Sequence, residues 1–521
     1  FKLLTAVHRI WPGVPEVHVP RVKGAVLSCD ISPELMGVGY IIGYRSAAIM
    51  VGGGLFSALV LIPAIALFGE GRTTPLYPAT ALIGDMAPTG SDGIWGRYIR
   101  YIGAGAVAAG GIINLIKGLP TIVDSFRASI RDLRLASEGR GGARPRTERD
   151  IPLWVVLGGS LALALLMSFL PQLKAVPGLG IGVVSAAAII VFGFFFSVVS
   201  SRITGELGSS SNPVSGMAIA TLMGTCLVFI ALGWKGHAYT AAALSIGAVV
   251  CIAASNAGTT SQDLKTSFLV GGTPWRQQTA IIVGVLTSVI FIGLTLQVLN
   301  ASREVQEAAY EVVLPAAPDA RREKGLDGHS YRIARAGGLD TIPDGTYLVD
   351  DSGRVRYRLQ EGIGSEDAPA PQATLMSLVI KGILTQKLPW GLVLLGVFTS
   401  IFMEVIGVPS LAFAVGMYLP LESTAPVFLG GLARKLVDWK RGREAESDAG
   451  PGVLYSSGLV AGGSLVGLAA SFLSFPEPPW VGRLAQALAF GGEALPAGVG
   501  FLAFLGVAWL VYRTAVRADR A

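Results

Sequence analysis

Residues 205–217 join two apolar segments and have the residue types of a binding site for a polar or anionic ligand. Asn212 is a favoured N-cap residue, and Pro213 suits the first position of a helix. A helix that begins here would direct free N–H groups and the positive end of its dipole at a bound carboxylate. An ordinary interhelical turn has the same Asn-Pro pair, so both interpretations stay open. The candidate ligand contacts are Ser211, Asn212, Pro213, Ser215 and Gly216, and Glu206 is a candidate proton acceptor beside them.

A second polar stretch, residues 254–274, is rich in hydroxyl and amide side chains and follows another apolar segment. If it is a re-entrant loop, Asp263 can take up a proton while its neighbours hold a polar substrate. If it is a surface loop, it has no special role. Asp263 and Lys265 are two residues apart, so they would not face each other on a helix. The candidate substrate contacts here are Gln262, Asp263, Lys265 and Thr266.

One acidic residue, Glu404, lies within the apolar run 390–408. An ionisable group in the hydrocarbon core of a membrane is costly, and it is by default a candidate for function. Glu404 is therefore a candidate for carrying a coupled proton, together with Asp263. The alternative is a residue at a helix end whose carboxylate reaches the membrane surface. Glu34 and Glu422 flank apolar segments, and we expect both at the interface with water.

Several catalytic classes lack their motifs in this chain. There is no G-x-x-x-x-G-K-[ST] phosphate-binding loop, so the chain does not itself use ATP to drive transport. A G-x-S-x-G nucleophile elbow and paired zinc-ligand motifs are missing as well. The four histidines form no cluster, and Cys29, Cys226 and Cys251 have neither a metal-ligand spacing nor a disulfide framework. We therefore expect neither an enzyme nor a bound cofactor or metal.

The composition requires a lipid environment for much of the chain. The chain has 521 residues, of which 51% are hydrophobic and only 15% charged, whereas soluble domains have about a quarter charged residues. Its mean hydropathy is +0.58. The 68 glycines recur inside apolar runs, where small residues allow membrane helices to approach closely. The net charge of +6 does not indicate nucleic-acid binding, because the basic residues lie in short loops beside apolar segments.

A membrane-spanning helix needs about 20 mostly apolar residues, and the chain has such runs for about ten to thirteen membrane segments. We predict an all-α, polytopic helix bundle with broken or re-entrant helices at 35–68 and 410–436. The run 35–68 is too long for one straight span, and Gly43 with Arg45 is the expected place of a break. Residues 346–359 have the pattern of strand, turn and strand, which predicts a small β-rich insertion outside the membrane. A poorly ordered loop is the alternative for this insertion.

Basic residues cluster at 124–150, 265–276, 434–443 and 513–520, which all fall on the same predicted side. The positive-inside rule assigns that side to the cytoplasm. We expect a multi-pass protein of the inner membrane of the cell, with the lipid bilayer as a partner and a homo-oligomer left open. The predicted parts are a cytoplasmic N-terminal segment of a truncated chain at 1–30, a first transmembrane block at 31–299, an extracytoplasmic insertion at 300–371 and a second transmembrane block at 372–521.

A weak internal repeat relates two of the predicted broken helices. Residues 38–55 align without gaps to residues 415–432, with seven identities in eighteen positions. Such a match in Gly-rich apolar sequence can also arise by chance. A true repeat would be the duplicated architecture of secondary transporters, in which helices broken at matching positions line the substrate site. The sequence leaves open whether the copies are parallel or inverted.

Several stretches, in order over most of the chain, resemble the prokaryotic branch of the oligopeptide transporter family, which is related to the yellow-stripe-like metal-chelate transporters. The more specific stretches are SSNPVSGM at 210–217 and QDLKTSFLVGGTPWRQQ at 262–278. The others are ISPELMGVGYIIG at 31–43, APQATLM at 370–376, KLPW at 387–390 and GVPSLAFAVGMYLPLESTAPVFLGG at 407–431.

The resemblance implies secondary active transport that imports oligopeptides and takes its energy from the proton gradient. Import of metal-chelate or siderophore complexes is the alternative, followed by a channel or a scaffold subunit of a membrane complex. The resemblance also implies that the two polar stretches named above line the pathway. Relatives are expected to have a glutamate at the position of Ser464, so Glu404 would have to replace that acid in proton coupling.

Overall fold

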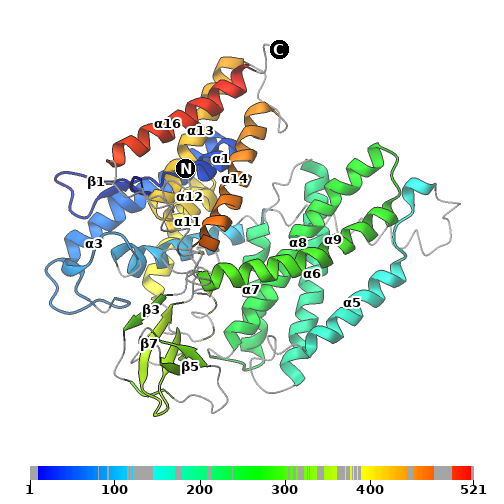
Figure 1. Ribbon diagram of the computed structural model, residues 1–521, viewed down its shortest axis with the longest axis horizontal. Helices are drawn as coiled ribbons and strands as arrows, with labels where there is room; N and C mark the ends of the chain where they lie inside the picture. Colours follow the sequence, from blue (N-terminus) through cyan, green and yellow to red (C-terminus); the bar gives the residue numbers. More distant parts are fainter. Residues whose placement is uncertain are drawn as a thin grey trace. The chain divides into compact units, whose positions relative to one another are not determined.

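The computed structural model describes residues 10–517 with gaps. The gaps are 80, 91–92, 114–115, 118–119, 121–144, 170–178, 208–213, 237–238, 303–304, 309–311, 315–321, 326, 328, 337–344, 361–369, 371–375, 378–379, 381–383, 385–388, 443–449 and 474–495. The chain forms two compact units, and helices dominate both (Figure 1). Unit 1 comprises Phe1–Val107, Leu296–Pro371 and Pro389–Ala521, and unit 2 comprises Ala108–Thr295 and Gln372–Leu388.

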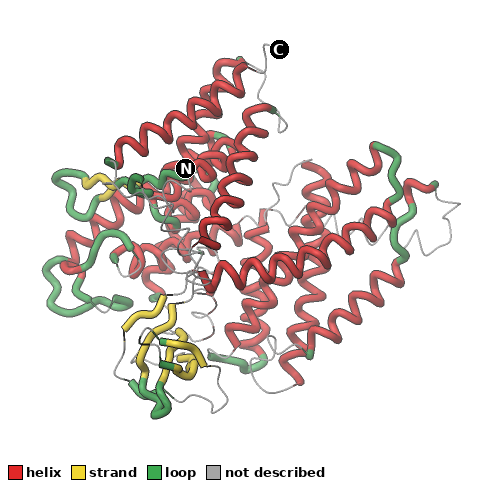
Figure 2. Tube along the Cα trace, in the orientation of Figure 1, coloured by secondary structure: helices red, strands yellow, loops and turns green. Residues whose placement is uncertain are grey.

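The prediction of an all-α, polytopic membrane protein is confirmed. Most described residues are helical, and the strands belong to two small sheets (Figure 2). Among the described residues, six helices are long and apolar enough to cross a membrane, and three shorter apolar helices accompany them. The six are Tyr44–Gly69, Gly180–Ser201, Thr240–Phe268, Pro274–Gln297, Pro451–Ala470 and Gly498–Val516.

Unit 2 is built around α8 (Thr240–Leu269), which packs along α6 (Leu179–Leu207) and α7 (Val214–Ala231). Its core is an apolar cluster at the contact of the three helices. A hydrogen bond of 2.5 Å from Ser200 Oγ to the Ala254 carbonyl oxygen joins α6 to α8 where both are buried. Because a buried hydroxyl group must find an acceptor, this bond fixes how the two helices face each other.

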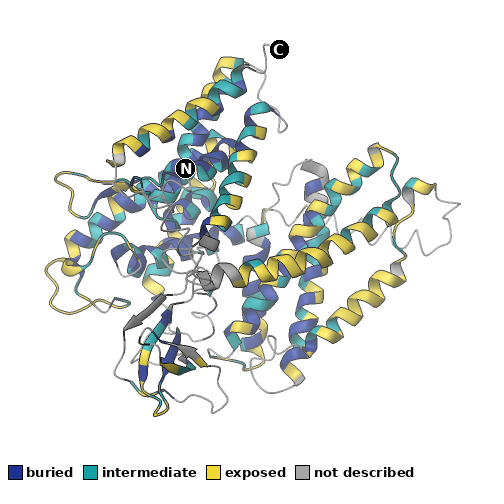
Figure 3. Cartoon of the chain, in the orientation of Figure 1, coloured by how far each residue is buried: buried dark blue, intermediate teal, exposed yellow. Residues whose placement is uncertain are grey.

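Two helices, α5 (Leu153–Ser168) and α9 (Pro274–Ser302), expose apolar side chains along most of their described length (Figure 3). Within the candidate span Pro274–Gln297 none of the most apolar window is buried. A helix that is apolar all round needs an apolar surrounding. These two helices therefore have the composition of lipid-facing helices.

Unit 1 contains two broken helices and the helices that enclose them. The first broken helix is α1 (Pro33–Ile42) followed by α2 (Tyr44–Phe56), a π-helical turn and α3 (Ile62–Gly69). The second is α12 (Ser410–Tyr418) followed by α13 (Leu421–Arg441). The enclosing helices are residues 94–107 of one helix, α11 (Trp390–Val405), α14 (Pro451–Leu473) and α16 (Ala497–Arg517).

An apolar core joins α1, α13, α14 and α16. Tyr40 is fully buried in it, and the guanidinium group of Arg434 lies over its ring at 5.5 Å. Arg434 Nε also lies 3.1 Å from the Asp438 carboxylate, one helical turn further along α13. A cation over an aromatic face and beside a carboxylate is stabilised by both, so Arg434 ties α13 to α1.

The predicted β-rich insertion is confirmed as a five-stranded antiparallel sheet. Tyr347, Leu348 and Val349 are consecutive and fully buried in its central strand. Because successive side chains of a strand point to opposite faces, both faces of the sheet are covered there. The strand order is β3 (Val305–Ala308), β7 (Val355–Gln360), β6 (Gly345–Val349), β5 (Ser330–Ala336) and β4 (Arg322–Lys324).

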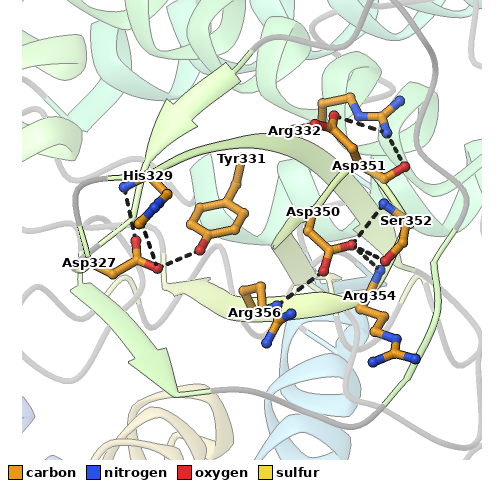
Figure 4. A network of polar contacts seen from close by, with 9 residues as sticks. All are labelled: Asp327, His329, Tyr331, Arg332, Asp350, Asp351, Ser352, Arg354 and Arg356. Atoms are coloured by element: carbon orange, nitrogen blue, oxygen red, sulfur yellow. Dashed lines mark hydrogen bonds and ion pairs between the residues drawn. The ribbon is translucent and has the colours of Figure 1, made fainter.

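One carboxylate holds the predicted turn between β6 and β7. Asp350 accepts hydrogen bonds from the backbone N–H groups of Ser352 (2.9 Å) and Arg354 (3.0 Å), and also from the Ser352 hydroxyl (Figure 4). These bonds lower the pKa of Asp350 to about 2, and the Ser352 hydroxyl contributes most. Gly353 follows with a φ of 81°, which glycine adopts without strain. The Asp-Asp-Ser-Gly sequence therefore forms a turn for a local chemical reason.

The C-terminal ends of α13 and α16 are neighbours. Arg441 donates a hydrogen bond of 2.9 Å from Nη2 to the Ala515 carbonyl oxygen. Both helix ends are basic, with Lys440 in α13 and Arg513 in α16. This contact agrees with the predicted location of both basic clusters on one side of the membrane.

The described part of the N-terminal segment, residues 10–31, lies at the opposite end of these two helices. The Asp30 N–H donates a hydrogen bond of 2.9 Å to the Glu422 carbonyl oxygen at the start of α13. Trp11 packs on Gly500 near the start of α16. That residues 1–30 lie in the cytoplasm stays a prediction, because these contacts place the segment against two helices and not on a side of the membrane.

Candidate functional site

Both broken helices of unit 1 have a local chemical cause for their break. Gly43 separates α1 from α2 with a φ of 82° and a ψ of 164°, a conformation that residues with a Cβ atom rarely adopt. The predicted break at Gly43 is confirmed. In the second helix, Leu419 and Pro420 are extended, with ψ of 145° and 148°. A proline has no N–H group to continue a preceding helix, and it disfavours helical geometry in the residue before it.

The two broken helices are copies of one another at an offset of 377 residues. α1 begins at Pro33 and α12 at Ser410, while α2 begins at Tyr44 and α13 at Leu421. The alignment of the sequence repeat has the same offset. Each copy therefore consists of a half-helix, a break and a longer helix that start at equivalent positions.

The copies pack against each other through glycines whose contacts are reciprocal. A Cβ atom added to Gly39 would overlap the Val427 carbonyl oxygen, and one added to Gly416 would overlap that of Met50. Gly416 is the equivalent of Gly39 in the second copy, and Met50 is the equivalent of Val427 in the first copy. Each contact is therefore made twice, as in a two-fold symmetric interface. The reciprocal pairs are Gly39–Val427 with Gly416–Met50, Gly53–Phe413 with Gly430–Met36, and Gly54–Thr424 with Gly431–Ala47.

The two-fold axis runs across the long helices, so the copies are inverted. Tyr44 at the start of α2 lies against Gly431 and Phe428, whereas Gly54 further along α2 lies against Thr424. α2 and α13 therefore run antiparallel, and an axis that exchanges antiparallel helices is perpendicular to them. Because α2 belongs to a candidate membrane span, the axis lies in the plane of the membrane. This is the geometry of an inverted repeat.

The half-helix α1 begins inside unit 1 and brings Glu34 into the bundle. Pro33 is buried, and Glu34 lies against Gly463, where an added Cβ atom would be 3.1 Å from Glu34 Oε2. Gly463 lies near the middle of the candidate span Pro451–Ala470. Glu34 is half-buried in this contact, which its place at the edge of an apolar run did not predict. The helical repeat was the signal that could have found this residue, because it defines a half-helix that starts at Pro33.

Glu404 lies in the last turn of α11 and contacts the start of the other half-helix. Its Oε2 atom accepts hydrogen bonds from Ser410 Oγ (2.6 Å) and from the Ser410 N–H (3.3 Å). A carboxylate at this position satisfies a free N–H group of α12 and is stabilised by the helix dipole. Ser410 is buried and Glu404 is half-buried. That Glu404 carries a proton stays a prediction.

The second polar stretch is regular helix, and the re-entrant loop considered for it is not what the structure shows. Gln262, Asp263, Lys265 and Thr266 occupy the last turns of α8, where Gln262 is half-buried and the other three are exposed. Thr266 Oγ1 donates to the Gln262 carbonyl oxygen (3.0 Å), which is how a helix accommodates a hydroxyl side chain. Their role as substrate contacts stays a prediction.

The turn that follows α8 is bound to the segment before α5. Arg146 donates hydrogen bonds of 2.9 Å to the Gly271 carbonyl oxygen and to Thr273 Oγ1. The Gln278 amide donates a further bond of 2.9 Å to the Asp150 carboxylate. Two of the basic loops thus meet at one end of unit 2, in agreement with their predicted location on one side of the membrane.

The first polar stretch lies partly outside the described residues. Ser211, Asn212 and Pro213 belong to the residues that the structure does not describe. The described part of α7 begins at Val214, directly after the Asn-Pro pair. The backbone of the other candidates, Glu206 in α6 and Ser215 and Gly216 in α7, is helical. Ligand binding by this stretch stays a prediction.

The described residues bring together one arrangement that fits a transport site. It is the inverted pair of broken helices, with Glu34 at the start of α1 and Glu404 at the start of α12. No group of three His, Cys, Asp or Glu side chains in the described part of the chain could hold a metal ion. The chemistry available at this arrangement is proton binding and the attraction of carboxylates by helix starts.

Comparisons with known proteins identify the family of the chain. A family model described as OPT oligopeptide transporter protein matches residues 19–317 and 355–474. A Haemophilus influenzae protein named as a proposed oligopeptide transporter is 26% identical over 480 residues, which are 86% of this chain and 66% of that relative. Since the family model matches most of the chain, this multi-pass membrane protein belongs to the oligopeptide transporter (OPT) family.

Proposed function

We propose that this protein is a secondary active transporter that imports oligopeptides and is driven by the proton gradient across the inner membrane. The observation that carries the proposal is the inverted pair of broken helices, α1–α2 and α12–α13. Secondary transporters bind their substrates near the bilayer midplane, between inverted repeats and at broken helices. The name of the Haemophilus influenzae relative supports oligopeptides as the substrate class.

The starts of the half-helices supply groups that a peptide carboxylate can use. The first N–H groups of α1 and α12 have no partner within their own helices, and the helix dipole makes these ends attractive to an anion. At α12 the Glu404 carboxylate already occupies the Ser410 N–H. A protonated Glu404 would hold this N–H less strongly, so a peptide carboxylate could replace it. Proton and peptide would then enter together, which is symport.

Uptake by the reconstituted full-length protein tests the proposal. We expect liposomes that contain the protein to accumulate labelled tetra-alanine when an inward proton gradient is present. A protonophore should abolish this accumulation. Uptake that continues at full rate after the gradient is collapsed would rule out symport. A channel would instead show a flux that rises linearly with the driving force and does not saturate, and a scaffold would show no uptake.

Competition decides between the two substrate classes. Metal chelates also present carboxylates, so a helix start could bind them as well. We expect excess unlabelled tetra-alanine to inhibit uptake of the labelled peptide more strongly than an equal concentration of an iron–amino-acid chelate. Stronger inhibition by the chelate, together with uptake of labelled iron, would assign the chain to metal-chelate transport.

A further inference from the structure

Glu34 is an acidic side chain that lies against an uncharged helix. It follows the buried residues Ser32 and Pro33 in the first turn of α1. A Cβ atom added to Gly463 would lie 2.9 Å from Glu34 Cβ, 3.0 Å from Cδ and 3.1 Å from Oε2. The sequence of α14 (Pro451–Leu473) contains no Asp, Glu, Lys or Arg. The half-buried side chain of Glu34 therefore packs on the backbone of a helix that has no charged residue.

The contacts between α1 and α14 determine the depth of Glu34. They are Gly452 with Tyr40, Gly37 with Ser456, and Gly463 with Glu34. The two helices thus run antiparallel, and Glu34 is the contact furthest along α14. At a rise of about 1.5 Å per residue, Gly463 lies about 4 Å from the middle of the span Pro451–Ala470. A carboxylate at this depth is costly when charged, which makes it a group that gains or loses a proton in response to its surroundings.

The other charged groups near α1 lie toward its two ends and differ in sign. Asp30 comes before α1, and its N–H group donates a hydrogen bond to the Glu422 carbonyl oxygen. Two acidic residues therefore lie near each other at this end of α1. The acidic residues raise the local concentration of cations, protons included. Toward the other end, Arg434 covers the ring of Tyr40. The remaining charged residues on helices packed against α1 are Arg45, Lys435, Asp438, Lys440, Arg441, Arg513 and Arg517.

We infer that the carboxyl group of Glu34 also takes up and releases a proton in each transport cycle. This inference rests on the proposed proton coupling and adds to Glu404 a second carboxyl group that is required for it. One proton moves from the water at the acidic end of α1 to the Glu34 carboxylate, and the neutral acid later gives the same proton to the water on the other side. No covalent bond of substrate or protein changes in this step.

A substitution that removes the titratable group separates this role from a structural one. In liposomes with the full-length protein, E34Q is expected to lose proton-driven accumulation of labelled tetra-alanine. It should keep exchange of labelled for unlabelled peptide across the membrane, because exchange needs no net proton movement. A folded E34Q protein that loses exchange as well would overturn the inference and make Glu34 a structural residue.

Two neighbouring glycines provide a matched control. G463A places a methyl group against Glu34, and we expect accumulation to fall by about tenfold or more because the carboxyl group is displaced. G462A adds a methyl group where nothing lies within 4 Å, and it should change the rate by no more than about twofold. Equal effects of the two variants would contradict the inference. This pair keeps the test available if E34Q does not fold.

Infrared spectroscopy tests proton binding without any substrate. The difference spectrum between acidic and neutral pH should contain the carbonyl bands of protonated carboxyl groups, and E34Q should lack one of them. If the spectrum of E34Q contains every band of the wild type, Glu34 does not bind a proton. Wild-type uptake that is coupled to protons, and remains coupled in E34Q, would overturn this inference and leave the proposed function intact. Wild-type uptake without any proton dependence would overturn both.

Discussion

The two copies of the inverted repeat are alike in packing and different in charge. Both start their helices at equivalent positions and exchange the same glycine contacts. The half-helix α1 has Glu34 in its own first turn, whereas α12 has Leu411 at the equivalent position. The first residue of α12 is instead hydrogen-bonded to Glu404 of α11. After the break, the first copy has Arg45 where the second has Glu422.

Residues that the two copies share are those that their packing requires. Residues that differ between the copies are the candidates for function. The glycine contacts recur because a Cβ atom would meet backbone atoms of the other copy at Gly39, Gly53, Gly416 and Gly430, and a side chain at Gly54 and Gly431. Charged residues are under no such constraint, and they have diverged at the half-helix starts and behind the breaks. The positions where the copies differ are therefore where the chemistry of transport is to be sought.

The largest effects are expected at the reciprocal glycines. G53A and G430A each place a Cβ atom on a backbone carbonyl oxygen of the other copy, and each should lower the free energy of unfolding by about 3 kcal/mol. Thermal unfolding in detergent measures this. The neighbouring variant G52A adds its methyl group to open space and serves as the control. Clearly unequal effects of G53A and G430A would show that the two-fold relation does not extend to energetics.

The two breaks are expected to respond differently to alanine. Gly43 has a φ of 82°, so G43A should cost about 2 kcal/mol of backbone strain. Pro420 and Leu419 have dihedral angles that any residue adopts, so P420A should cost less than about 1 kcal/mol. Unfolding temperatures of the two variants under the same conditions measure the difference. A larger loss for P420A than for G43A would contradict the causes assigned to the breaks.

The Glu404 carboxylate at the start of α12 should contribute about 1 kcal/mol to the free energy of unfolding, which is the usual contribution of a helix-capping side chain. S410A removes the hydrogen bond from the Ser410 hydroxyl, and E404Q weakens the same bond by removing the charge of its acceptor. The double variant should therefore be less destabilised than the sum of the two single variants. Adding Leu411→Glu to E404Q gives α12 the arrangement of α1 and should recover part of the loss. No recovery would mean that the two half-helix starts are not interchangeable.

The smallest effect is expected at Arg45. A cation in the first turn of a helix opposes the dipole, so R45Q should stabilise the protein by about 0.5 kcal/mol at low salt. Because Arg45 is exposed, high salt should remove most of this gain. Comparing unfolding temperatures at low and high salt tests the prediction. Destabilisation by R45Q at low salt would show that Arg45 has a favourable role in the first copy.

The sequence was sufficient for features that depend on local chemistry. Apolar runs of membrane length indicated a helical membrane protein, and the lipid-facing character of α9 shows why a strong hydropathy signal is reliable there. The break at Gly43 followed from a glycine inside an overlong apolar run. The turn at Asp350 followed from an Asp-Asp-Ser-Gly sequence between two strand-like segments, because its hydrogen bonds lie within five residues.

Features that depend on packing between distant segments were not predictable in this way. Glu34 stands at the edge of an apolar run, and only its contact with Gly463 shows that this edge lies near the middle of α14. Asp263 is exposed on a helix because α8 continues beyond its apolar part as regular helix. A polar run after an apolar segment is compatible with a loop or with such an extension, and hydropathy does not distinguish them.

The reciprocal glycine contacts also determine which movements are open to the two copies. Backbone meets backbone at Gly39 and Gly430 between α1 and α13, and at Gly53 and Gly416 between α2 and α12. Each half-helix therefore cannot slide along the long helix of the other copy without collisions. A movement of α1 is thus transmitted to α13, and a movement of α12 is transmitted to α2.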